Sequence, residues 1–76
     1  KVLIANITNG NRLETYIIVD ERPGQIVLNG AAAHRGQAGD RVIIMSFAQM
    51  SAEEAESHKP RVAVLDEANN ILELRP

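Results

Sequence analysis

The stretch KVLIANITNG, residues 1–10, decides how this chain folds. Residues 1–7 form an apolar run rich in Val and Ile, which is typical of a strand buried on both faces. Asn9-Gly10 follows, and this pair is the strongest short hairpin signal because both residues tolerate a positive φ. The sequence therefore predicts a hairpin whose return strand is Arg12–Val19, a segment rich in β-branched and aromatic residues.

The rest of the chain reads as short strands separated by turns. Turn-forming residues cluster at 20–24, which contains Pro23-Gly24, and again at 36–40 and 66–70. Between them we expect strands at residues 25–28, 41–47, 61–65 and 71–74. Residues 30–34 are too small to form a core element, so they predict a tight loop or one helical turn.

One short helix is expected in the second half of the chain. Ser51-Ala52-Glu53-Glu54 has the capping-box pattern, in which the serine hydroxyl accepts from the backbone N–H three residues on and the glutamate reaches back. The helix should continue for about two turns to His58 and stop before Pro60. About six short strands and one short helix favour a mainly β fold, a small barrel.

Composition sets limits on size and partners. The 76 residues allow a single domain, and a core this small is often only marginally stable alone. Oligomerisation or a further N-terminal segment is the expected source of extra stability. A net charge of −2, one Tyr, one Phe and no Trp give no basis for nucleic-acid binding. No apolar run approaches the roughly 20 residues that span a bilayer, so we expect no membrane association and a cytoplasmic location.

Metal and serine-nucleophile chemistry have little support. The chain has two histidines and no cysteine, and no spacing typical of a structural zinc site, so no metal is expected. Ser, His and Asp are all present, but no nucleophile-elbow pattern is.

Two segments carry a more specific signal, Arg12-Leu13-Glu14-Thr15-Tyr16 and Asn29-Gly30-Ala31-Ala32-Ala33-His34. They resemble the two signature segments of the aspartate 1-decarboxylase family, the pyruvoyl enzymes that make β-alanine. The resemblance continues, in order, through residues 8–10, 39–44, 53–55 and 59–60, and so covers nearly the whole chain.

The resemblance implies a fold and an activity. It implies that residues 1–76 are a double-psi β-barrel domain that lacks its N-terminal portion, whereas the pattern alone does not separate this barrel from SH3-like or OB-like ones. It also implies a homotetramer that converts L-aspartate to β-alanine and CO₂ on the route to pantothenate. The substrate amine would form a Schiff base with a pyruvoyl group, whose carbonyl acts as the electron sink.

The source of that cofactor is not visible in this sequence. In the family the precursor cuts itself at a Gly-Ser bond, and the serine becomes the pyruvoyl group. This chain contains no Gly-Ser pair. We therefore expect it to be the C-terminal part of the α subunit, active only with the missing N-terminal segment or β chain that completes it.

The resemblance assigns roles to Arg12 and Tyr16. A guanidinium can hold a carboxylate through two parallel hydrogen bonds, and the family uses the arginine at this place for the substrate. The family's tyrosine donates the proton that the decarboxylated carbon needs. In a regular strand the two residues share a face. Without the resemblance, they would be a solvated arginine and an ordinary amphipathic strand tyrosine.

Thr15 and the second segment complete the expected site. The family ties the threonine to backbone self-cleavage, although its β-branched side chain also suits any strand. Asn29 has an amide that can orient a substrate or pyruvoyl group, and Gly30, Ala31 and Ala32 let backbone N–H groups approach a ligand. A plain Asn-Gly turn is the alternative for Asn29.

Two other functions remain open from the sequence. One is a non-catalytic small β-barrel that serves as a binding or adaptor module. The other is a family member that has lost self-processing. A Gly-Ser bond upstream of Lys1 would favour the enzyme over the binding module.

Overall fold

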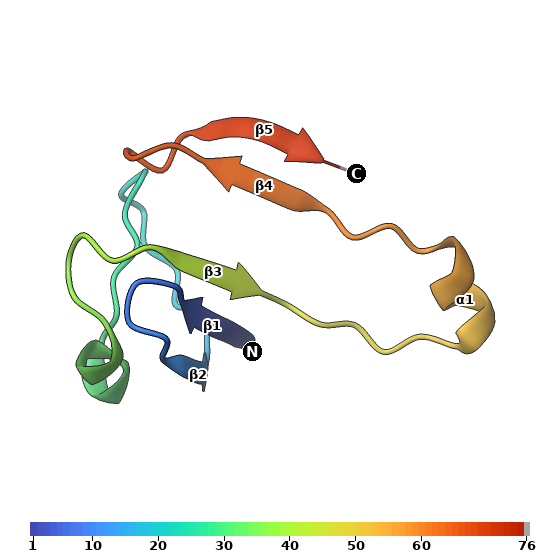
Figure 1. Cartoon of the computed structure of the whole chain (residues 1–76), viewed down its shortest axis with the longest axis horizontal. Helices are drawn as coiled ribbons and strands as arrows, with labels where there is room; N and C mark the ends of the chain where they lie inside the picture. The colour runs from blue at the N-terminus through green and yellow to red at the C-terminus, as the bar shows by residue number, and fades with distance from the viewer. Residues whose placement is uncertain (76) are drawn as a thin grey trace. The chain divides into compact units, whose positions relative to one another are not determined.

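The computed structural model describes residues 1–75, which form two compact units. Unit 1 comprises residues 1–20 and 26–47, and unit 2 comprises residues 21–25 and the described chain from residue 48 onward. Figure 1 shows the elements in chain order, and their bounds are β1 Val2–Asn6, β2 Arg12–Thr15, η1 Gly30–Arg35, β3 Val42–Met45, α1 Ala52–Ser57, β4 Val62–Leu65 and β5 Ile71–Arg75.

Unit 1 is built on a three-stranded antiparallel sheet with β1 at its centre (Figure 1). The hairpin partner β2 lies on one side of β1 and β3 lies on the other. In this register Ile4 is opposite both Leu13 and Ile44, so the middle of the sheet pairs apolar side chains across three strands.

Burial along β1 alternates, as the two-residue period of a strand requires. Val2, Ile4 and Asn6 are 5%, 4% and 2% exposed, whereas Leu3 and Ala5 are only half-buried. The prediction that this strand is buried on both faces was therefore wrong. One face of β1 is covered within the unit and the other is partly open.

The predicted Asn9-Gly10 hairpin is confirmed. Gly10 has φ +79°, a conformation that favours glycine, and its N–H donates to the Asn6 carbonyl at 2.8 Å. The return strand ends at Thr15, however, and not at Val19. Val2 pairs with Thr15, so β1 has no residues left to pair with Ile17 and those after it.

The segment before η1 also differs from expectation. Residues 25–28 form no strand, and Ile26 and Val27 are exposed. Their side chains suit a strand, but a strand needs a neighbour, and the described part of the chain offers none to this segment. Residues 30–34 do form the expected helical turn, as part of the 3₁₀ helix η1.

In unit 2, β4 and β5 form an antiparallel hairpin, with an irregularity between Val64 and Leu65. The Asp66 carboxylate accepts from the N–H groups of Ala68 and Asn70 at 2.9 Å each, and so closes the predicted turn. Asn69 adopts φ +64°, and its Nδ2 donates to the Gly24 carbonyl at 2.9 Å. That bond holds the 21–25 segment within unit 2.

The predicted helix is present as α1, with Ser51 as its N-cap. The Ser51 hydroxyl accepts from the Glu54 N–H at 3.1 Å and donates to Glu54 Oε1 at 3.2 Å. The glutamate side chain therefore folds back onto the serine hydroxyl. The helix gives way to extended backbone at His58, two residues before Pro60.

The mainly β class is confirmed, with differences in detail. The described residues contain five strands in two sheets, and one 3₁₀ helix in addition to the α-helix. About six strands and a single helix were expected. Closure into a double-psi barrel stays a prediction.

Replacing the helix cap tests the local basis of α1. Ser51→Ala removes the acceptor for the Glu54 N–H and should lower the free energy of unfolding by about 1 kcal/mol. Ser46→Ala, which makes the same chemical change outside the helix, is the control. Urea unfolding of both variants in the complete protein measures the difference, and equal midpoints would contradict the capping role.

Candidate functional site

The two signature segments come together in unit 1, where β2 and η1 are in contact. Three asparagine side chains connect them. The Nδ2 atoms of Asn6, Asn9 and Asn11 lie 3.3, 2.9 and 3.3 Å from the carbonyl oxygen of Arg35, the last residue of η1. These hydrogen bonds connect the β1–β2 hairpin to the C-terminal end of η1.

Arg12 is the first residue of β2, opposite Ala5, and its side chain is exposed. Among residues 1–75 its guanidinium takes part in no ion pair or hydrogen bond. A planar guanidinium without an internal partner is available to bind a carboxylate through two parallel bonds.

Thr15 and Tyr16 line a common pocket. Its volume is about 170 Å³, and Lys1 and Glu14 form the rest of its wall. Lys1 Nζ lies 2.9 Å from Glu14 Oε2, so the wall carries an exposed ion pair. A second pocket of about 360 Å³ shares Lys1 and Glu14 and adds Val2, Leu3 and Phe47.

The strand geometry expected for Arg12 and Tyr16 holds only as far as Thr15. Within β2, Arg12 and Glu14 lie on the exposed face, while Leu13 and Thr15 are half-buried. Tyr16 follows the end of the strand and is 77% exposed, so the shared-face argument does not extend to it. The pocket therefore brings Thr15 and Tyr16 together but does not include Arg12.

The second segment forms the beginning of η1. Asn29 occupies the N-cap position in an extended conformation, and its side chain makes no capping bond. Gly30 has φ +60°, which L side chains rarely adopt, and a Cβ there would meet no atom within 4 Å. Ala31 is exposed and Ala32 half-buried. The first N–H groups of a helix have no partner within it, so this end of η1 presents small side chains and free donors.

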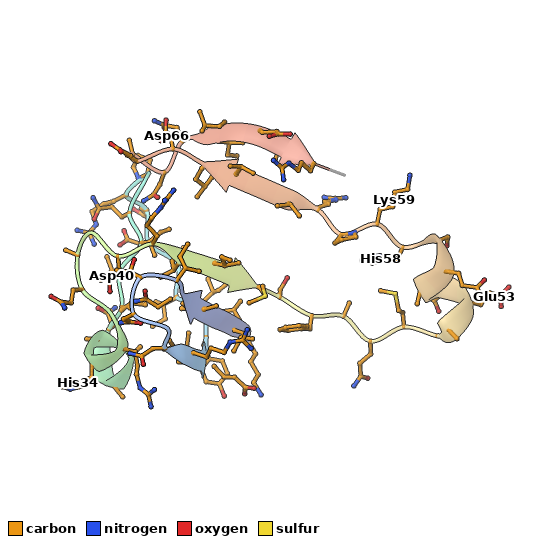
Figure 2. The ribbon with its side chains drawn as sticks, in the orientation of Figure 1. His34, Asp40, Glu53, His58, Lys59 and Asp66 are labelled. Atoms are coloured by element: carbon orange, nitrogen blue, oxygen red, sulfur yellow. The ribbon has the colours of Figure 1, made fainter. Side chains whose placement is uncertain are left out.

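Asn6 and Asp40 were missed by the sequence analysis. Asn6 Nδ2 donates to Asp40 Oδ2 at 2.9 Å, and the Gln37 N–H donates to the same oxygen at 2.9 Å. Asp40, labelled in Figure 2, lies in the loop that joins η1 to β3. The sequence did contain a signal for Asn6. It is a polar residue two positions after Ile4 in an apolar run, so it lies on the same face of the strand, and a buried polar residue must find hydrogen-bond partners.

These bonds change the acidity of Asp40. Hydrogen bonds from the Asn6 side chain first, and then from the Gln37 N–H, stabilise its charged form and lower the pKa of its carboxyl group. The pKa of Asp66 is lowered in the same way, mainly by the Asn70 backbone N–H.

Other classes of site were sought in the described part of the chain. No three His, Asp or Glu side chains in residues 1–75 are grouped so that they could hold a metal ion. None of the described helices is long and apolar enough to cross a membrane.

Comparison with known proteins decides the family. The family model for aspartate decarboxylase matches residues 1–72. The chain belongs to this family. The matched range includes both signature segments and the three asparagines, Asn6, Asn9 and Asn11.

Individual relatives agree with this assignment. The chain is 61% identical over 75 residues to an aspartate 1-decarboxylase of Bacillus licheniformis, a match that covers 97% of the chain and 59% of the relative. It is 54% identical over 77 residues to one of Listeria monocytogenes, covering 100% of the chain and 61% of the relative. A Clostridium kluyveri relative is 51% identical, with coverage of 97% and 59%. The chain thus spans about three fifths of the length of these family members.

The lowered pKa of Asp40 predicts a pH dependence of stability. Because the folded-state pKa lies below the unfolded value of about 3.9, the contribution is present above that pH and is lost as pH falls through the folded-state pKa. Asp40→Asn cannot lose a charge there, so its stability should fall less between pH 6 and pH 3 than that of the wild type. Urea unfolding at several pH values measures this, and parallel curves for the two proteins would contradict it.

Proposed function

We propose that the protein containing this chain is a cytoplasmic aspartate 1-decarboxylase, which converts L-aspartate to β-alanine and CO₂ in pantothenate biosynthesis. The observation that carries the proposal is the family match over residues 1–72, together with relatives of that name that align with nearly the whole chain. The free guanidinium of Arg12 and the pocket at Thr15 and Tyr16 support it.

Arg12 would bind a carboxylate of the substrate. Its guanidinium is exposed, and no described residue neutralises it, so little internal bonding is lost when an anion binds. The bidentate geometry also fixes the orientation of the carboxylate, which a lysine ammonium would not do.

Thr15 and Tyr16 would act at different stages. The Thr15 hydroxyl would polarise the backbone carbonyl that is attacked during self-cleavage. The Tyr16 phenol would deliver a proton to the carbon that has lost CO₂. Their common pocket places both hydroxyl-bearing residues beside one cavity, which supports a shared location for processing and catalysis.

The residues at the start of η1 fit a pyruvoyl group. When bound, such a group supplies a conjugated carbonyl that accepts the electron pair left by decarboxylation. The Asn29 side chain makes no capping bond and can donate to a carbonyl, and there is open space where a Cβ of Gly30 would lie. The small side chains of Ala31 and Ala32 would also allow a ligand to approach the backbone. These residues would hold and orient the group and the substrate.

Assembly would complete the site. Many apolar side chains of unit 1 are exposed in the described chain, namely Ile7, Ile17, Ile18, Val19, Ile26, Val27, Ile43, Ile44 and Phe47. An exposed apolar surface of this kind is typical of an interaction site. We propose that the N-terminal segment or β chain and neighbouring subunits of a homotetramer cover it, and that the double-psi barrel closes on assembly.

The proposal is tested by intact mass spectrometry of the complete protein together with an assay of β-alanine production. Two chains, the larger blocked by a ketone, and aspartate-dependent release of CO₂ are expected. The 76-residue chain alone should be inactive, because it contains no Gly-Ser bond from which a pyruvoyl group could form. A single uncut, inactive chain would instead identify a binding module or a member that has lost self-processing.

Substitution of Arg12 tests the carboxylate contact. Arg12→Ala in the complete protein should weaken aspartate binding by about 2–5 kcal/mol, because a charged partner is left unpaired. Arg12→Lys should restore little of this. Steady-state kinetics measures the loss, and near-normal turnover by the alanine variant would show that Arg12 is an ordinary surface residue.

Thr15 and Tyr16 separate processing from chemistry. Thr15→Val should leave most of the precursor uncut, with little change in stability. Tyr16→Phe should cut normally but decarboxylate about 10²–10⁴-fold more slowly, the effect of losing a general acid. Gel analysis of the precursor and an assay normalised to cut chain measure the two effects. Normal cutting by Thr15→Val, or wild-type turnover by cut Tyr16→Phe, would remove that role from the residue concerned.

A further inference from the structure

We propose that Asn6, Asn9 and Asn11 form an asparagine clamp that positions η1 against the β1–β2 hairpin. The clamp fixes the start of η1 relative to Arg12, so its members are positioning residues for the reaction. The inference rests on the proposed function for what is positioned, but the clamp itself can be tested without it.

The clamp acts on a single backbone oxygen. The carbonyl of Arg35 ends η1, and the last carbonyls of a helix have no partner inside it. Nδ2 atoms of all three asparagines lie within 3.3 Å of this oxygen, and Asn9 Nδ2 is the nearest at 2.9 Å. A carbonyl oxygen has two lone pairs and cannot accept three full hydrogen bonds, so Asn9 makes the short bond while Asn6 and Asn11 make longer and weaker ones.

Asn6 anchors the clamp from within the sheet. Its Oδ1 accepts from the N–H groups of Thr8 and Asn9 at 3.0 and 3.2 Å, while its Nδ2 donates to Asp40 and Arg35. The residue is 2% exposed and none of its side-chain polar atoms lacks a partner. An aspartate side chain has the same shape but no N–H donor. Only the asparagine amide can both accept from the turn N–H groups and donate to Asp40 and Arg35.

The segment that follows η1 is held against the same amide. A Cβ on Gly36 would lie 3.1 Å from Asn6 Nδ2 and 2.9 Å from Leu28 Cδ1, so the backbone packs closely there. The Arg41 N–H donates to Thr8 Oγ1 at 2.8 Å, a second bond from this segment to the hairpin turn. The end of η1 and the chain after it thus meet one buried side chain.

The clamp lies between the two groups that the reaction needs. Arg12 follows Asn11 directly in the chain, and Asn29-Gly30 begins the helix whose last carbonyl Asn11 contacts. This short path of hydrogen bonds should therefore help to hold Arg12 at a fixed distance from the start of η1. Loosening the clamp should mainly impair the binding of a substrate that both segments contact.

Asn9→Asp gives the sharpest test, because it removes the N–H donor and keeps an acceptor, while the negative charge that it adds is also present in the control. The carboxylate can still accept from the Asn11 N–H, as Asn9 Oδ1 does at 2.9 Å, but it cannot donate to Arg35. Asn69→Asp is the matched control, since it removes an amide-to-carbonyl bond of the same 2.9 Å length in unit 2.

Hydrogen exchange of the η1 amides in the complete protein is the first measurement. Exchange at residues 33–35 should be about two- to tenfold faster in Asn9→Asp than in the wild type, as expected for the loss of one net hydrogen bond. It should be unchanged in Asn69→Asp. Equal exchange in all three proteins would overturn the clamp, whatever reaction the protein catalyses.

Aspartate kinetics, normalised to cut chain, is the second measurement. Asn9→Asp should raise the KM by a similar factor with a smaller change in kcat, and Asn69→Asp should change neither. Faster η1 exchange with an unchanged KM would overturn the positioning role. An inactive wild type would refute the proposed function and leave the exchange result to decide the clamp.

A charge-exchange pair tests Asn6 itself. Asn6→Asp places two carboxylates at a 2.9 Å contact and should speed η1 exchange more than Asn9→Asp does. Asn6→Asp combined with Asp40→Asn restores an amide–carboxylate bond and should return part of the protection. Absence of any recovery would overturn the role of the Asn6–Asp40 bond, and if Asn6→Asp does not fold, Asn9→Asp still decides the clamp.

Discussion

The buried amide of Asn6 is the interaction on which the architecture of unit 1 depends. A polar side chain on the covered face of a central strand is costly unless every donor and acceptor is used, and here all are used. Its partners come from the hairpin turn, the end of η1 and Asp40. One satisfied side chain therefore ends a strand, shapes the turn after it and fixes a helix that begins far away in the sequence.

Apolar burial contributes less within the described chain. Val2 and Ile4 are its only buried apolar residues, while large apolar side chains remain exposed on β3, on β5 and beyond β2. A domain with so little covered surface has limited stability of its own. The polar contacts at Asn6 give unit 1 a defined local structure, and the exposed residues supply the surface for the assembly proposed above.

The features that were predicted correctly are those set within a few residues. Asn9-Gly10, the Ser51 cap and the Asp66–Asn70 turn each depend on backbone preferences and bonds between near neighbours. Residues 17–19 and 25–28 have equally strong strand composition but form none, because a ladder requires a partner strand that local sequence does not specify. Asn6 was missed for the same reason, since its partner Asp40 is 34 residues away.

The candidate site shows the same division between local and long-range determinants. The signature segments were recognisable because their residue types are specific, but the sequence did not show what joins them. Arg12 belongs to a paired strand beside the clamp, whereas Tyr16 lies beyond the ladder and is largely exposed. A group that grips a substrate benefits from a rigid base, because a misplaced bidentate contact loses both bonds. The proton donor proposed at Tyr16 needs only to reach one atom, so it would tolerate a less rigid position than Arg12.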